Sequence, residues 1–178
     1  MLGLTMTHGF DMYRVFLSAP GDLGPERRAC HEVIARANET TAMPAKVLLV
    51  AVELREDEHI VGYRSIVSDN VRWSAFFIQV FADDWGPKNL FRKLFHLAVE
   101  CRDSVSMPMR EVVVCLKDAP HETDPEILAF RQELQDYQGV RLFHYANLDE
   151  LSTQLLEIAT GWAQKIVQEN QAAKTATG

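Results

Sequence analysis

Cysteine is scarce in this chain. Only three of the 178 residues are cysteines, at Cys30, Cys101 and Cys115, and no CxxC pair occurs. An odd count without such pairs argues against a disulfide framework and against the common zinc motifs. Each cysteine falls at a core-facing position of an expected helix or inside an expected strand. We therefore expect buried, reduced thiols in a cytoplasmic protein.

Positive charge and long apolar runs are also lacking. The chain has 18 Lys and Arg against 25 Asp and Glu, which gives a formal net charge of −7. It therefore has no basic footprint for nucleic acid or an anionic membrane surface. No apolar run reaches about 18 residues, so we expect no membrane span, and residues 1–10 lack the pattern of a signal peptide. The six histidines are scattered outside any HxxxH or GxSxG context, so neither a catalytic triad nor a metal site is expected.

The most informative segment is residues 13–28. An apolar run from Tyr13 to Leu17 predicts a buried strand, a Ser-Ala-Pro-Gly-Asp turn follows at residues 18–22, and Pro25 opens a helix with one apolar face. A strand, a tight turn and a helix N-terminus form a βα corner. Ligands of open α/β sheets bind at such corners, where backbone N–H groups and the helix dipole favour anions.

Five apolar segments alternate with five amphipathic ones along the rest of the chain. This alternation predicts a parallel sheet covered by helices on both faces, as a flavodoxin-like or TIR-like three-layer sandwich with strand order 2-1-3-4-5. We expect one domain over residues 12–170, a flexible segment at 1–11 and a disordered tail at 171–178. The predicted strands are 13–17, 46–52, 75–82, 111–117 and 140–145.

In this strand order the exit loops of the first and third strands face each other across one crevice. From the first loop, Ser18, Gly21 and Asp22 are candidates to hold a phosphate or a sugar, although a simple tight turn explains them as well. The second loop offers carboxylates for ribose hydroxyls and an aromatic ring that stacks on a base or a nicotinamide. The alternative there is a solvated loop whose tryptophan anchors on the sheet edge. The candidates in the second loop are Asp83, Asp84, Trp85 and Gly86.

Two further groups of charged residues are candidates for a role at a site. The acidic run Glu53–His59 matches no calcium-binding spacing and is expected to be a solvated loop. Glu100 lies with Lys93 on the flank of the helix that follows the third strand, beside its apolar stripe. A carboxylate there could reach the crevice from the side, but a surface ion pair explains it equally well.

The chain resembles a TIR-like family known as domain of unknown function 4062. The resemblance spans about residues 13–167 and rests on three stretches: Val15–Asp22 with Glu26-Arg-Arg28, Ala75–Gly86, and Val112–Asp118 with the helix and strand that follow. It implies a module found in prokaryotic signalling or defence proteins. The wider group is similar to TIR domains and nucleoside deoxyribosyltransferases. Those relatives bind nucleosides or NAD at this crevice and cleave the N-glycosidic bond with a glutamate near the start of the helix after the third strand.

At that helix the sequence departs from the family pattern. Residues Asn89–Phe95 contain no acid, cationic Arg92 and Lys93 stand where the acid is expected, and Glu100 comes about 10 Å further along the helix. We therefore expect a non-catalytic or weakly catalytic module. It would bind NAD or another nucleotide-like ligand, or a protein partner, at the crevice, or it would self-associate. The alternative is an NAD glycohydrolase or deoxyribosyltransferase-like enzyme with Glu100 as substitute carboxylate. A flavin carrier is less favoured, since the first turn is not rich in Ser and Thr.

Overall fold

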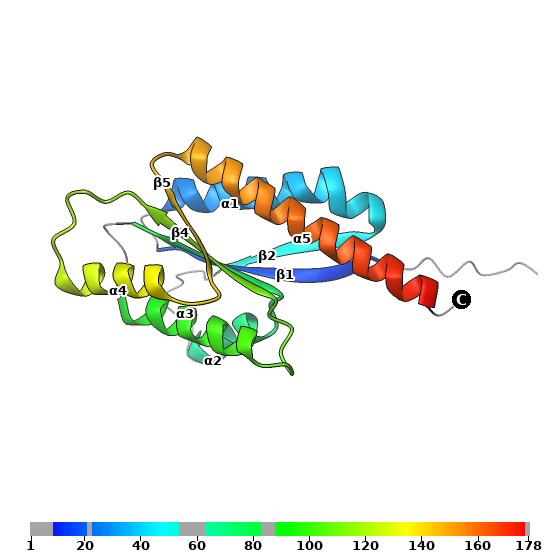
Figure 1. Ribbon diagram of the computed structural model, residues 1–178, viewed down its shortest axis with the longest axis horizontal. Helices are drawn as coiled ribbons and strands as arrows, with labels where there is room; N and C mark the ends of the chain where they lie inside the picture. Colours follow the sequence, from blue (N-terminus) through cyan, green and yellow to red (C-terminus); the bar gives the residue numbers. More distant parts are fainter. Residues whose placement is uncertain (1–8, 21–22, 54–62, 83–87, 177–178) are drawn as a thin grey trace, which may run out of the picture.

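A computed structural model describes residues 9–20, 23–53, 63–82 and 88–176 of the chain (Figure 1). Strands and helices alternate along the described part of the chain, as the sequence predicts. The strands are β1 (Asp11–Ser18), β2 (Val47–Glu53), β3 (Phe76–Phe81), β4 (Glu111–Lys117) and β5 (Arg141–Tyr145). The helices are α1 (Gly24–Ala37), α2 (Tyr63–Arg72), α3 (Lys88–Asp103), α4 (Pro125–Asp136) and α5 (Leu148–Ala176).

All strand pairs in the sheet are parallel, and the strand order is β2-β1-β3-β4-β5. This is the flavodoxin-like order, so the predicted fold class is confirmed. β1 and β3 are direct neighbours, with Val15 opposite Phe76 and Ser18 opposite Gln79. The carboxyl ends of β1 and β3 therefore lie side by side, at the position where the strand order reverses.

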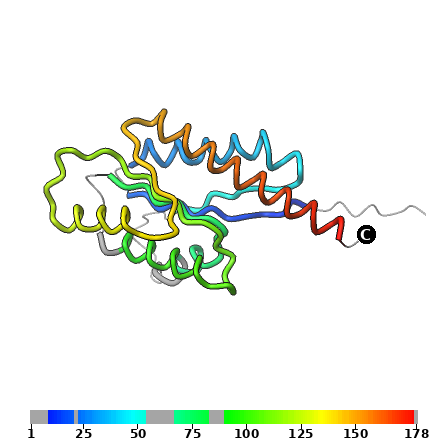
Figure 2. Tube along the Cα trace, in the orientation of Figure 1, coloured from blue at the N-terminus to red at the C-terminus, as the bar shows by residue number. Residues whose placement is uncertain are grey.

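The helices form two layers. α1 and α5 cover one face of the sheet, and α2, α3 and α4 cover the other (Figures 1 and 2). Successive residues of a strand point to opposite faces, so Val15 and Leu17 pack with the α1/α5 layer while Phe16 packs with the α2/α3/α4 layer. The Trp162 ring of α5 stacks on Phe76 of β3, with 4.2 Å between the ring centroids. These apolar faces explain why near-continuous apolar strands sit in the middle layer.

The segment between α1 and β2 is helical rather than an open loop. The chain continues from α1 into a π-helical turn (Asn38–Ala42) and a 3-10 turn (Met43–Ala45). The cause is Asn38, whose side-chain amide donates to the Leu49 carbonyl and accepts from the Leu49 N–H, both at 2.8 Å. This pair satisfies backbone groups of the outer strand β2, so a longer helical segment is held against the sheet.

Both expected domain boundaries shift in the structure. β1 begins at Asp11 rather than after it, because the Asp11 N–H donates to the Lys46 carbonyl at 2.9 Å. α5 runs to Ala176, so residues 171–176 are helical where the sequence suggested a disordered tail. These residues are exposed, but most of them have favourable helix propensity and extend a helix that the core already nucleates. Among the described residues, no helix is long and apolar enough to cross a membrane.

Candidate functional site

The predicted ligand crevice lies at the carboxyl ends of β1 and β3. Of its candidate residues, Gly21, Asp22, Asp83, Asp84, Trp85 and Gly86 lie outside the described residues. The structure therefore tests this site only through Ser18 and the strands that lead into the two loops. The adjacency of β1 and β3, on which the site depends, is confirmed.

Ser18 ends β1 as a fully buried residue, with 0% of its surface exposed. Its hydroxyl donates to Oε1 of Gln79 at 2.9 Å. In return, Nε2 of Gln79 donates to the Ser18 carbonyl at 3.0 Å and lies 3.3 Å from the Val80 carbonyl. The Ser18 side chain is thus committed to Gln79, and a ligand at this corner would meet the backbone that follows Ser18.

Gln79 is the functional-site residue that sequence reasoning missed. It is fully buried in β3 among aromatic and aliphatic neighbours, and its amide joins β3 to β1 next to their exits. A buried amide is costly unless its groups are hydrogen-bonded, so its presence in such a strand indicates a specific partner. The signal in the sequence was one polar residue inside the apolar run Phe76–Phe81.

Glu100 is not brought to Ser18. α3 begins after the carboxyl end of β3 and returns to the amino edge of the sheet, where β4 begins. Glu100 is exposed in the last turns of α3, about 18 Å along the helix axis from its start at 1.5 Å per residue. A carboxylate in that position does not line the β1/β3 crevice. The substitute role proposed from the sequence is therefore not supported by the geometry.

A second polar cluster lies at the same edge of the sheet, between β4 and α1. Glu26, in the first turn of α1, is 4% exposed and accepts from Lys117 Nζ at 2.9 Å. The pair lines a cavity of about 370 Å³ whose remaining wall is residues 146–149. Sequence reasoning noted Glu26 only within the resemblance, since a glutamate near a helix start is usually a surface residue.

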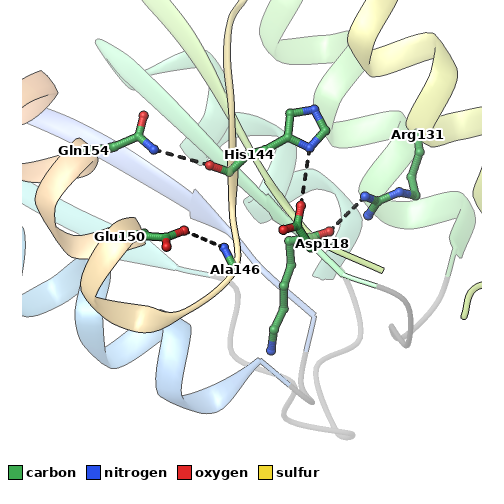
Figure 3. Close-up of polar contacts among 7 residues, drawn as sticks. Asp118, Arg131, His144, Ala146, Glu150 and Gln154 are labelled. Carbon is green, nitrogen blue, oxygen red and sulfur yellow. Dashed lines mark hydrogen bonds and ion pairs between the residues drawn. The ribbon is translucent and has the colours of Figure 1, made fainter. Parts of the chain in front are cut away.

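Hydrogen bonds fix the β5–α5 corner beside this cavity (Figure 3). The Asn147 side chain accepts from the Glu150 N–H at 3.0 Å and so caps α5, and the Glu150 side chain accepts from the Ala146 N–H at 2.8 Å, one residue before the N-cap. Asp118 lies 3.8 Å from His144 Nδ1, and its N–H donates to the Tyr145 carbonyl. Backbone N–H groups around the start of α5 already donate to the Asn147 and Glu150 side chains. The corner therefore serves to hold the chain rather than to bind a ligand.

The thiols are buried, as predicted. Burial, reinforced by the charge of Glu26, raises the pKa of Cys30 from its ordinary 9.0 to about 12. Burial also raises the pKa of Cys115 and of Cys101. Because the thiolate is the reactive form, these thiols are not nucleophiles at neutral pH. Burial and Glu26 likewise raise the pKa of Tyr145.

Most of the acidic run at residues 53–59 lies outside the described residues. Its first residue, Glu53, ends β2 and lies 3.1 Å from Nε2 of His31 on α1. Within the part of the chain that the structure describes, no group of three or more His, Cys, Asp or Glu side chains could hold a metal ion.

Comparison with known proteins adds little. No protein-family model matches the chain, and no curated protein matches it. Among solved structures, the metal-soaked flavodiiron core of Flv1 from Synechocystis is similar, with a TM-score of 0.46 and 13% sequence identity. The match covers 92% of this chain, and the chain spans 37% of that protein's chain. So distant a similarity bears on neither ligand nor activity.

Proposed function

We propose that this chain is a non-catalytic, TIR-like binding module that takes a nucleotide-like ligand at the carboxyl ends of β1 and β3. The observation that carries the proposal is the reciprocal pair of hydrogen bonds between Ser18 and Gln79. These bonds hold the exits of two adjacent strands in one fixed arrangement, at the reversal of strand order where α/β sheets bind ligands. A pre-organised binding site needs its loops to start from strand ends that are held rigidly.

The ligand class follows from the loop residues that the sequence supplies. Backbone N–H groups at Gly21 and Asp22 suit an anionic group such as a phosphate. The carboxylates of Asp83 and Asp84 suit ribose hydroxyls, and Trp85 suits a flat heteroaromatic ring. A ligand with all three parts is a nucleotide such as NAD. The resemblance to the TIR-like family supports the same class, in a cytoplasmic protein of prokaryotic signalling or defence.

Binding without cleavage is supported by where the nucleophilic and acidic groups lie. The Ser18 hydroxyl is bonded to Gln79, Glu100 is at the far edge of the sheet, and Glu26 is paired with Lys117. The positively charged Lys93 is exposed on α3, near the expected acid position, and would disfavour an oxocarbenium-like centre, while Arg92 beside it is ion-paired with Glu133 at 2.6 Å. The competing function, N-glycoside hydrolysis or transfer, would need a carboxylate free to stabilise the anomeric carbon, and neither Glu26 nor Glu100 is so placed among the described residues.

Calorimetric titration of the full chain with NAD, ADP-ribose and ATP tests the proposal. We expect saturable binding of at least one of them and no nicotinamide release from NAD by chromatography. Asp84→Ala should weaken that binding about tenfold or more, because a hydrogen bond to a charged group contributes about 1.5–3 kcal/mol. The matched control is Asp118→Ala, an exposed carboxylate after β4 at the same edge, which should leave binding unchanged.

Two results would contradict the proposal. Rapid nicotinamide release would establish the enzyme instead, and a variant series could then locate its carboxylate. If circular dichroism shows that the protein is folded and none of the three nucleotides binds, the nucleotide proposal is wrong. Binding of a protein partner at the two loops would then be the remaining function.

A further inference from the structure

Exposed large apolar side chains gather at one end of the molecule. Six of the eight such residues in the described part of the chain lie at the amino edge of the sheet, in the segments that lead into the strands. The six are Phe10, Met12, Met43, Trp73, Val105 and Met107. The other two are Leu128 on α4 and Leu148 at the start of α5, at the carboxyl edge. An apolar surface concentrated at one end of a molecule indicates an interaction site.

The centre of this surface is formed by Phe10, Met12 and Trp73, which we name the β1 patch. Their exposed fractions are 48%, 69% and 68%. The Ala75 N–H donates to the Arg14 carbonyl at 2.9 Å, so Trp73, two residues before Ala75, lies next to the part of β1 that contains Met12. Met12 is on the same face of β1 as Phe16, which packs with the α2/α3/α4 layer, and Trp73 directly follows α2.

Among the described residues, helices cover the sheet beneath the β1 patch on one side only. Asp11–Arg14 pair with β2 but not with β3, which first pairs with β1 at Val15. α5 lies along one face of this projecting pair of strands, and no described helix lies on the other (Figure 1). Leu48 and Val50 of β2, opposite Met12 and Arg14, are consequently only half-buried.

The charges around the β1 patch are of both signs. Exposed Arg14 and Arg72 are cationic, and exposed Asp69 and Glu100 are anionic. Asp69 is one helical turn before Trp73, whose N–H donates to the Asp69 carbonyl. Arg72 and Glu100 both act on the pKa of the Cys101 thiol, which places them in one neighbourhood. The border of the β1 patch therefore carries charges of both signs, although the whole chain has a formal net charge of −7.

We infer that the β1 patch is the contact surface for a second copy of this chain, in a two-fold symmetric dimer. In a two-fold interface each residue meets the partner's surface reciprocally, so a border that carries charges of both signs can pair with itself. Elsewhere, two copies that each carry −7 would repel. Tryptophan, methionine and arginine are the residue types that interfaces favour. The inference is independent of the nucleotide proposal, because the two surfaces lie at opposite edges of the sheet.

Sedimentation velocity over a range of protein concentrations tests this inference. Wild type should shift from 20.2 kDa towards twice that mass as concentration rises. Trp73→Lys and Met12→Lys should each weaken self-association about 30-fold or more, as expected for a central contact residue. Leu128→Lys is the matched control: Leu128 is also a large exposed apolar residue, 45% accessible, but it lies on α4.

A wild-type chain that stays monomeric at every concentration would overturn the inference. So would a dimer that survives both Trp73→Lys and Met12→Lys, or one that Leu128→Lys weakens equally. A variant lacking residues 1–8 tests whether this segment, rather than a second copy, covers the β1 patch. If only the shortened chain dimerises, the segment covers the patch and the inference fails. Circular dichroism of each variant establishes that it is folded.

Discussion

The hydrogen bonds between Ser18 and Gln79 give a sharp quantitative prediction. Gln79→Leu keeps the approximate volume of the side chain but removes the acceptor of the Ser18 hydroxyl and the donor to the Ser18 carbonyl. Both residues are fully buried, so water does not replace the lost partner without rearrangement. The substitution therefore leaves a buried hydroxyl unsatisfied.

The magnitude follows from the cost of that hydroxyl. A buried polar group without a partner costs about 1–3 kcal/mol, and each lost neutral hydrogen bond contributes about 1 kcal/mol. We expect Gln79→Leu to lower the free energy of unfolding by about 3 kcal/mol. Ser18→Ala should cost about 1–2 kcal/mol, since it leaves Oε1 of Gln79 without its donor. The double variant should cost less than the sum by about 1–2 kcal/mol, because neither the Ser18 hydroxyl nor Oε1 of Gln79 is then present to be left unsatisfied.

Urea unfolding followed by circular dichroism measures all four free energies of this double-mutant cycle. In thermal unfolding, Gln79→Leu should lower Tm by roughly 6–12 °C, since each kcal/mol moves a domain of this size by about 2–4 °C. Costs that add within about 0.5 kcal/mol would refute the coupling between the two side chains. Nucleotide binding by the double variant, if it folds, reports separately on whether the pair positions the loops.

Two further predictions concern the thiols and a helix cap. The folded-state pKa of Cys30, about 12, exceeds its ordinary 9.0, so the thiol's contribution to stability is full below about pH 9 and is lost as pH rises towards 12. The stability difference between wild type and Cys30→Ala should therefore shrink by about 1.4 kcal/mol per pH unit above pH 9 in reducing urea titrations, and a constant difference would contradict it. Asp124→Ala removes the acceptor of the Glu126 N–H at 2.9 Å and should cost about 1 kcal/mol in unfolding titrations. Asp136→Ala, at the other end of α4, is the control, and equal losses from the two substitutions would contradict a capping role.

The fold was predictable because its signals are local and mutually consistent. The apolar strand Glu111–Lys117 occurs at its predicted position, and a helix begins next to Pro25, as predicted. Alternation of these elements then leaves few parallel topologies. The π-helical turn after α1 was not predictable, since it depends on hydrogen bonds between Asn38 and Leu49, eleven residues apart.

The candidate site was less accessible to sequence reasoning. The adjacency of the carboxyl ends of β1 and β3 follows from the predicted strand order. The hydrogen-bond partner of Ser18, Gln79, lies 61 residues away in the sequence and could not be predicted. Nothing local indicates that the Ser18 hydroxyl is occupied, or that Glu26 is buried against Lys117. Glu100 could be placed on a helix flank from its spacing, but its distance from the crevice depends on the direction of α3 relative to the sheet.

The start of β1 and the end of α5 meet at the amino edge, where the Asn170 side-chain amide donates to Asp11 Oδ2 at 3.1 Å. A short linker joining these two points would turn the chain into a ring, which could be reopened at the exposed turn around residues 119–123 to give a circular permutant. Such a molecule would keep every strand pairing while moving both ends to the opposite pole. Fluorophores or fusion partners attached there would report on the ligand edge without crowding the surface proposed for dimerisation.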